Sequence, residues 1–181
     1  MVNTLDLIIG PMFSGKTSRL LQIARKIDQE RDISFIIKPD FDKRYEESKD
    51  KTHIISHDGL KKECYIVGNL INFLIEIEKE INKRSESNQS IDHLWIIIDE
   101  GQFFENLREF CEKILSNSNI NKIIKVKIIV SGLDGDYKKQ PIGEILSLIP
   151  ISDSVLKLKG KCEYCDEESI LSKRICKSVD Q

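Results

Sequence analysis

The chain has 181 residues, of which 40% are hydrophobic and 32% are charged, so it can bury the core of one ordinary domain with a small appendage. Its formal net charge is −2 and no stripe of basic residues stands out, which argues against a nucleic-acid partner. The N-terminal residues lack the basic segment of a signal peptide and no apolar run approaches the length of a membrane span, so we expect a soluble cytoplasmic protein without a membrane partner.

Continuous apolar runs and segments with helical spacing alternate along the chain. The runs predict buried strands, whereas the apolar residues at helical spacing predict amphipathic helices. Strands that alternate with helices predict an α/β fold with a parallel sheet. In chain order we expect a strand at 5–9, a helix at 18–27, strands at 33–38 and 64–67, a helix at 69–83, a strand at 94–98, a helix at 107–115, a strand at 123–130, a helix at 142–148 and a last strand at 154–158.

Two polar segments interrupt this alternation. Residues 40–53 are highly charged and predict a loop or a mobile hairpin. Residues 53–57 can pair with another strand, and the Asp58-Gly59 pair that follows is a turn signal. Residues 85–92 are polar without periodicity, so we expect a surface loop there.

The stretch GPMFSGKT at residues 10–17 matches the phosphate-loop pattern G-x-x-x-x-G-K-[ST]. It joins the first predicted strand to the first predicted helix, which is the context that this motif requires. Backbone N–H groups within residues 11–17, where Pro11 itself has none, can then converge on an anion at the positive end of the helix. Lys16 would reach the β- and γ-phosphates of a nucleotide, and the Thr17 hydroxyl would bind Mg²⁺. The alternative interpretation is a tight turn with an exposed lysine.

Two carboxylates follow the apolar run 94–98 directly. Asp99 falls at the carboxyl end of a predicted parallel strand, where ligands bind in open α/β sheets, so it fits a second partner for Mg²⁺. Its alternative role is an acidic helix cap. Glu100 could accept a proton from an attacking hydroxyl or orient a water molecule. These residues alone leave a kinase, an ATPase and a nucleotide-driven switch open.

Six short motifs, in a fixed order, carry a resemblance to a known family. Together they make the chain, from about residue 5 to about residue 174, resemble the thymidine kinase family of the zinc-containing, tetrameric type. The phosphate loop is common to a large superfamily, but Met12 and Phe13 inside it, combined with DEGQFF and LDGD, are specific. The six motifs are GPMFSGKT at 10–17, DKRY at 42–45, SHDG at 56–59, DEGQFF at 99–104, GLDGDY at 132–137 and CEYC at 162–165.

The resemblance implies an ATP-dependent thymidine kinase that phosphorylates the 5′-hydroxyl of thymidine and yields thymidine monophosphate and ADP. It implies a P-loop α/β domain over residues 1–159, a partial zinc or lid segment over 160–181, and a homotetramer. Arg44 and Asp58 fall in segments that border the active site in the family.

The resemblance also implies roles for individual residues. Glu100 is then the base that takes the proton from the 5′-hydroxyl, and Thr17 and Asp99 hold Mg²⁺. Met12 and Tyr137 lie at the thymine. The residues implied to bind ATP are Gly10, Pro11, Met12, Phe13, Ser14, Gly15, Lys16, Thr17, Asp99, Glu100, Gly101 and Gln102.

Three features depart from the family pattern. Tyr137 stands where the family usually has a phenylalanine against the base, and Ile142 stands where a phenylalanine usually follows the proline. Cys162 and Cys165 have the spacing of half a zinc site, and the family completes such a site with a second pair, for which Cys176 is the remaining candidate here. The family's glycine-rich lid has no match up to Gln181, so we expect the 181-residue chain to bind ATP with Mg²⁺ better than it processes nucleoside.

Two alternatives stand beside the kinase. One is a catalytically weak or degenerate nucleotide-binding protein, and the other is an unrelated P-loop ATPase that couples hydrolysis to a partner. The presence of Lys16, Thr17, Asp99 and Glu100 argues against degeneration.

Overall fold

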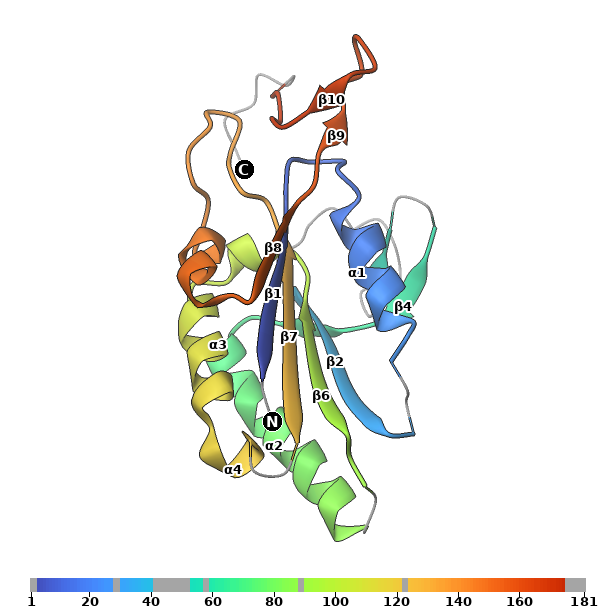
Figure 1. The fold of residues 1–181 in the computed structure, drawn as a ribbon, viewed down its shortest axis with the longest axis vertical. Coiled ribbons are helices and arrows are strands. Elements are labelled where there is room, and N and C mark those ends of the chain that lie inside the picture. Colours follow the sequence, from blue (N-terminus) through green and yellow to red (C-terminus); the bar gives the residue numbers. More distant parts are fainter. Residues whose placement is uncertain are drawn as a thin grey trace.

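A parallel sheet forms the centre of the computed structural model, which describes residues 3–27, 30–40, 53–56, 59–87, 90–121 and 124–174. The strand order is β5-β2-β6-β7-β1-β8, and each pair of neighbours runs parallel (Figure 1). The α/β fold with a parallel sheet is therefore confirmed. The six strands are β1 (Thr4–Ile9), β2 (Asp32–Pro39), β5 (Tyr65–Val67), β6 (His93–Ile98), β7 (Lys125–Gly132) and β8 (Ser154–Lys157).

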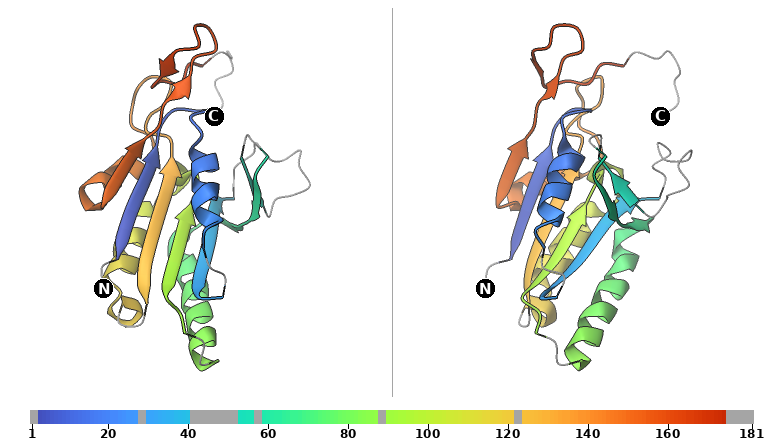
Figure 2. Two further views of the ribbon diagram at one scale, coloured as in Figure 1. Left: turned by 45° about the vertical axis from the view of Figure 1, so that its right-hand side comes forward. Right: turned by 90° about the vertical axis from the view of Figure 1, so that its right-hand side faces the viewer.

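Helices cover both faces of this sheet (Figure 2). One face carries α1 (Lys16–Ala24) and a hairpin of β3 (His53–Ile55) and β4 (Lys61–Glu63). The other face carries the remaining helices, which are α2 (Leu70–Glu86), η2 (Gly101–Phe103), α3 (Leu107–Ser116), α4 (Ser118–Asn121) and the 3-10 helix η3 (Ile145–Ile151). The carboxyl-terminal halves of β1, β6 and β7 are buried on both sides, and their sequences there are continuous apolar runs rather than alternating ones.

Two apolar clusters hold these layers together. The larger lies between the sheet and α2, α3 and η3, and it includes Ile96, Phe110 and Ile128, all fully buried. The smaller lies under α1 and includes Leu20, Leu21 and Ile97. Each such side chain stabilises the fold by about 1.5–3 kcal/mol relative to an exposed one. The smaller cluster therefore fixes α1, and with it residues 10–17, against the sheet.

The carboxyl ends of the central strands meet at one edge of the sheet. β7 lies between β1 and β6, with Ile9 opposite Gly132 and Ile98 opposite Val130. The segments that leave β1, β6 and β7 are therefore neighbours in space although they lie far apart in the sequence. These three segments carry most of the predicted site.

Several elements differ from the predicted ones. The helix predicted at 142–148 is the 3-10 helix at 145–151, because Gly143 takes a left-handed φ of 59° that ends any helix starting earlier. The strand predicted at 33–38 extends one residue further at each end, from Asp32 to Pro39. The sequence did not predict β4, α4, β9 (Gly160–Lys161) or β10 (Glu168–Ser169). Arg44, Asp58 and Cys176 lie outside the described residues, and the division at residues 159 and 160 stays a prediction.

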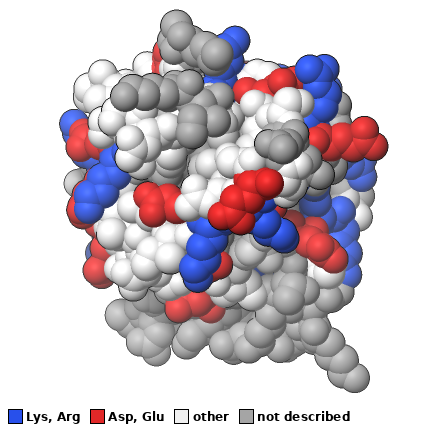
Figure 3. Space-filling view, turned by 90° about the horizontal axis from the view of Figure 1, so that it is seen from below, with Lys and Arg blue, Asp and Glu red and all other residues white. Residues whose placement is uncertain are grey.

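One face of the molecule shows interspersed charges. Seen from below, lysine and arginine side chains lie among aspartate and glutamate side chains (Figure 3). In the described part of the chain, no helix is long and apolar enough to cross a membrane.

Candidate functional site

The phosphate loop lies at the carboxyl edge of the sheet, between β1 and α1. Gly15 has a φ of 81°, a conformation that favours glycine, and it directly precedes the first residue of α1. The side chain of Lys16 is only 7% exposed, and its Nζ donates to the carbonyl of Pro11 at 2.6 Å. The lysine thus folds back over its own loop, at the helix end that attracts anions.

Asp99 connects the phosphate loop to the ends of two strands. Its Oδ2 accepts a hydrogen bond from the Thr17 hydroxyl at 3.0 Å, and its Oδ1 accepts one from the Ser131 hydroxyl. The carboxylate is 5% exposed. Burial and the neighbouring charge of Glu100 raise the pKa of Asp99 to about 6, although the hydrogen bonds from Ser131 and Thr17 act in the opposite direction.

Glu100 is held by its neighbours in an uncommon backbone conformation. Its φ is 53°, in the left-handed region that non-glycine residues seldom adopt, and such conformations gather at functional sites. The side chain is 8% exposed. Gln102 donates from Nε2 to Glu100 Oε2 at 2.6 Å, and Gln102 Oε1 accepts from the backbone of Leu133 at 2.9 Å. Through Gln102, the Glu100 carboxylate is therefore connected to the segment that follows β7.

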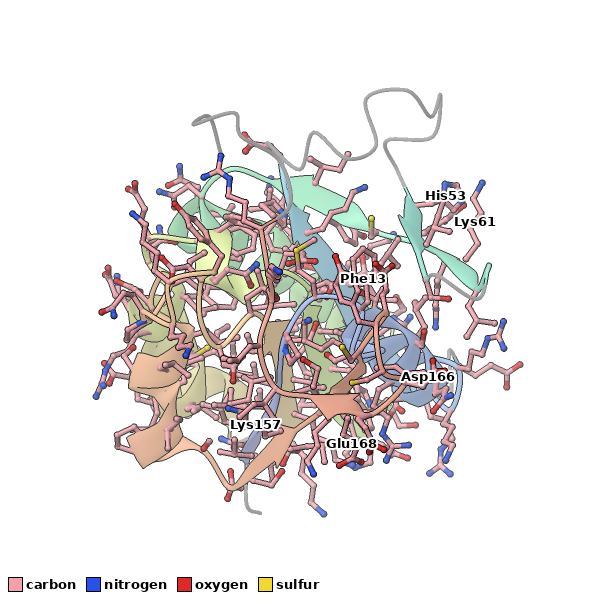
Figure 4. The ribbon with its side chains drawn as sticks, turned by 90° about the horizontal axis from the view of Figure 1, so that it is seen from above. Phe13, His53, Lys61, Lys157, Asp166 and Glu168 are labelled. Carbon is pink, nitrogen blue, oxygen red and sulfur yellow. The ribbon has the colours of Figure 1, made fainter. Side chains whose placement is uncertain are left out.

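A pocket opens over the phosphate loop. Seen from above, Phe13 lies between the hairpin that carries His53 and Lys61 and the β9–β10 tip that carries Asp166 (Figure 4). The Phe13 side chain is 73% exposed. The pocket brings the phosphate loop and Glu100 together, and its lining residues are Met12, Phe13, Ser14, Gly15, Lys16, Thr17, Ser18, Ile55, Glu100 and Leu133.

Tyr137 lies at the tip of the loop that follows β7. Asp136 shapes that tip, since its Oδ1 accepts the backbone N–H groups of Lys138 and Gln140 at 2.7 and 2.9 Å. The Tyr137 hydroxyl accepts a hydrogen bond from Arg174 Nη1 at 3.3 Å, and this contact is the main cause that lowers the pKa of Tyr137. Tyr137 is not among the residues that line the phosphate-loop pocket, whereas Met12 is.

The segment after β10 passes over the phosphate loop. The backbone N–H of Met12 donates to the Ser172 hydroxyl at 2.9 Å. Two residues further on, the Arg174 guanidinium makes its contacts with Tyr137. This segment therefore connects the two residues that the sequence placed at the thymine.

The two cysteines of the CEYC motif lie in the tip of the β9–β10 hairpin. The Cys162 backbone N–H donates to Glu167, and the Asp166 N–H donates to the Cys162 carbonyl, which closes a tight turn. Backbone N–H groups of Tyr164 and Cys165 approach the Cys162 thiol and lower its pKa. Within the described residues, no group of three or more His, Cys, Asp or Glu side chains could hold a metal ion.

Two residues at this edge were missed by the sequence reasoning. Ser131 bonds to Asp99. Because Ile98 lies opposite Val130, the next residues along the two strands, Asp99 and Ser131, are neighbours, and the strand order and register would have revealed this. Lys38, 5% exposed at the end of β2, donates to the carbonyl of His53 at 3.1 Å and so ties the hairpin to the sheet. A charged residue at the end of an apolar strand was the available signal.

Comparison with known proteins finds one family, both by a family model and by individual relatives. A model of the thymidine kinase family matches residues 3–181. The chain is 35% identical over 175 residues to a thymidine kinase of Oryza sativa, 36% identical over 168 residues to thymidine kinase a of Arabidopsis thaliana, and 34% identical over 172 residues to the thymidine kinase of vaccinia virus strain Ankara.

The matches cover most of this chain but different shares of the relatives. They cover 94%, 92% and 94% of this chain, respectively. The chain spans 56% of the length of the rice protein, 63% of the Arabidopsis protein and 82% of the vaccinia protein.

Proposed function

Because the chain belongs to the thymidine kinase family, we propose that it transfers the γ-phosphoryl group of ATP to the 5′-hydroxyl of thymidine, giving thymidine monophosphate and ADP. The observation that carries the proposal is the meeting of three segments at one sheet edge. The Thr17 hydroxyl lies 3.0 Å from Asp99, and Glu100 follows Asp99 into the pocket that the phosphate loop lines. Phosphoryl transfer needs this combination of an anion cradle and carboxylates.

The triphosphate would bind over residues 10–17. Lys16 sits at the start of α1, where its charge and the helix dipole add to the field of the loop amides. In the structure its ammonium group bonds to the carbonyl of Pro11, within the same loop. Binding of the β- and γ-phosphates would replace part of that contact by contacts with phosphate oxygens.

Thr17 and Asp99 would hold Mg²⁺. Their oxygens are 3.0 Å apart, and Mg²⁺ usually takes one or two carboxylates together with phosphate oxygens and water, so this donor set fits. The ion would neutralise charge that develops on the phosphate oxygens. Ser131, which also bonds to Asp99, would keep the carboxylate oriented toward Thr17.

Glu100 would act as the general base. It would take the proton of the 5′-hydroxyl while the bond from that oxygen to the γ-phosphorus forms and the bond to the leaving ADP oxygen breaks. A positioned base typically contributes about 10²–10⁴ to the rate. Support comes from its place in the pocket lining and from its fixed contact with Gln102.

The nucleoside would lie between Met12 and the loop that carries Tyr137. Met12 lines the pocket, and Tyr137 presents an aromatic ring at the tip of a loop shaped by Asp136. An aromatic face can stack on a pyrimidine, and the Tyr137 hydroxyl already has a partner in Arg174. We therefore propose thymidine and deoxyuridine as preferred acceptors over purine nucleosides.

Cys162 and Cys165 would supply two ligands of a zinc site. The supporting observation is the turn that directs backbone N–H groups at the Cys162 thiol and lowers its pKa, because zinc binds the thiolate. The described residues supply only this pair, so a tetrahedral site needs further donors. Zinc content of the purified protein, measured against that of a Cys162→Ser variant, tests the assignment.

We also propose a homotetramer in the cytoplasm, on the resemblance to the family. One structural feature supports self-association. One of the two outer strands of the described sheet, β8, is exposed at all four residues and includes Val155 and Leu156. An exposed apolar edge strand is a ready surface for another chain. Sedimentation of wild type and Leu156→Lys would test it, since a smaller species is expected only for the variant.

One assay tests the activity. Purified protein is incubated with labelled ATP, Mg²⁺ and thymidine, and the products are separated. Thymidine monophosphate is expected. Transfer to water alone would favour the P-loop ATPase, and ATP binding without turnover would favour a nucleotide-binding protein. The matched control is Glu100→Gln, which removes the base and leaves residues 10–17 intact.

A further inference from the structure

Gln102 joins two parts of the site through the two ends of one amide group. Its Nε2 donates to Glu100 Oε2 at 2.6 Å, and its Oε1 accepts the N–H of Leu133 at 2.9 Å. Only nitrogen can donate and only oxygen can accept, so the two contacts together decide which way the amide points. The side chain is 4% exposed, and few water molecules can compete for either contact.

Two glycines leave the space that Gln102 occupies. A Cβ atom at Gly132 would lie 2.2 Å from Gln102 Oε1, and a Cβ atom at Gly143 would lie 1.9 Å from the Gln102 carbonyl oxygen. Side chains at either position would displace the residue. The end of β7 and the segment before η3 therefore enclose Gln102 and set its place relative to the sheet.

Gln102 is buried beside the phosphate-loop pocket. Among the described residues that line the phosphate-loop pocket are Glu100 and Leu133, the two residues that Gln102 bonds to, and Gln102 is not among them. The amide thus stands behind the pocket wall. Its contacts act on that wall rather than on the contents of the pocket.

We propose that Gln102 is a positioning residue, which holds the Glu100 carboxylate and links its placement to the 133–140 loop. The proposal rests on the proposed function, in which Glu100 takes the proton of the nucleoside hydroxyl. Glu100 has a left-handed backbone and a flexible side chain, so its carboxylate needs an outside contact to stay in one place. The same amide is bonded to Leu133, and the loop that begins there carries Tyr137 at its tip. Nucleoside docking against that loop would therefore also fix the position of the Glu100 carboxylate.

A double-mutant cycle tests this. Gln102→Leu keeps a side chain of similar size but removes both hydrogen bonds. We expect kcat for thymidine phosphorylation to fall by about 10- to 100-fold, with KM for ATP changed by less than about twofold. In the Glu100→Ala background, the same substitution should change kcat by less than about threefold, because Gln102 then has no base to position.

The controls separate positioning from folding. Gln22→Leu makes the same chemical change at an exposed position of α1, where Gln22 contacts Arg19, and should keep wild-type kcat. Gln102→Glu keeps an acceptor for Leu133 but loses the donor to Glu100, so it should lower kcat like Gln102→Leu. The single tryptophan, Trp95, lies in β6 and reports the thermal unfolding of each variant.

Three outcomes overturn the proposal. Wild-type kcat in Gln102→Leu and Gln102→Glu would show that the contact has no role in the reaction. An equal loss with and without Glu100 would show that Gln102 acts on the structure generally. If the wild type phosphorylates no thymidine, the proposed function fails and the inference falls with it, whereas the first two outcomes leave the proposed function standing.

Discussion

The guanidinium group of Arg174 lies over the ring of Tyr137, with 5.0 Å between the guanidinium carbon and the ring centroid, and it also donates to the Tyr137 hydroxyl. The tyrosine stands where the family usually has phenylalanine, and a phenol hydroxyl needs a hydrogen-bond partner. Arg174 supplies that partner from the segment that also accepts the Met12 N–H through Ser172. The hydroxyl of Tyr137 is thus used to connect two segments of the site.

Arg174→Gln should raise KM for thymidine by about two- to fivefold, because a cation over an exposed aromatic ring contributes modestly. Tyr137→Phe keeps the ring contact and loses only the hydroxyl, so its effect should be smaller. KM for ATP should not change in either variant. Lys173→Gln is the matched control, since Lys173 lies over Tyr164 instead. A larger effect from Lys173→Gln than from Arg174→Gln would contradict this assignment.

Lys16→Ala should abolish measurable phosphoryl transfer and weaken ATP binding, because the ammonium group is the fixed positive charge of the phosphate loop. Steady-state assays and nucleotide titration measure the two effects. Arg19→Gln removes a cation one turn further along α1, where Arg19 bonds to Gln22, and should leave both properties near wild type. Wild-type turnover in Lys16→Ala would refute a phosphate-loop role for residues 10–17.

Glu100→Gln and Asp99→Asn should have different effects. Glu100→Gln should keep ATP binding and lower kcat by about 10²–10⁴, because the base is lost. Asp99→Asn should instead shift the Mg²⁺ concentration at which the rate is half-maximal to higher values, because one carboxylate ligand is lost. Magnesium titrations of the rate measure both. Small, equal effects of the two substitutions would contradict this division of roles.

The stability of the metal-free protein should carry a pH dependence that belongs to Asp99. Its pKa is raised from 3.8 to about 6 in the fold, chiefly by burial. Between these values the folded chain keeps a proton that the unfolded chain has lost, so this residue makes the free energy of unfolding fall as pH rises through that window. The free energy of unfolding can be measured by chemical unfolding at several pH values with a chelator present. As pH rises through this window, it should fall less steeply, or rise more steeply, for Asp99→Asn than for wild type. Parallel curves would be inconsistent with a raised pKa.

The parts of the fold that could be predicted are those encoded by local pattern. The apolar runs at 5–9 and 94–98 became β1 and β6, and the amphipathic pattern at 69–83 became most of α2. The β9–β10 hairpin was missed because its strands have two residues each and no periodicity to detect. The sequence also predicted the phosphate loop between a strand and a helix, and it predicted Asp99 and Glu100 at the end of a strand. Each of these positions follows from the end of a single element.

The contacts between distant segments could not be predicted in the same way. Ser131 binds Asp99 only because β7 inserts between β1 and β6, and strand order is a property of the whole sheet. Arg174 reaches Tyr137 through the path of the chain after β10, which no local pattern encodes. The sequence predicts Gln102 as part of a nucleotide-binding stretch and does not predict its neighbours. Its contact with Leu133 depends on space left by Gly132 and Gly143, which only the packed structure shows.

The insertion of β7 between β1 and β6 also has a consequence during synthesis. Thr17 and Asp99 are 82 residues apart, and Asp99 and Ser131 are 32 apart, so the site is assembled from segments that lie far apart in the sequence. A nascent chain that ends before β7 lacks the strand that lies between β1 and β6, so one edge of each is left open. Such open apolar edges invite association with other chains. Ribosomal pausing before residue 125 would therefore expose the protein to aggregation, and a chaperone that shields those edges would be of most use in that interval.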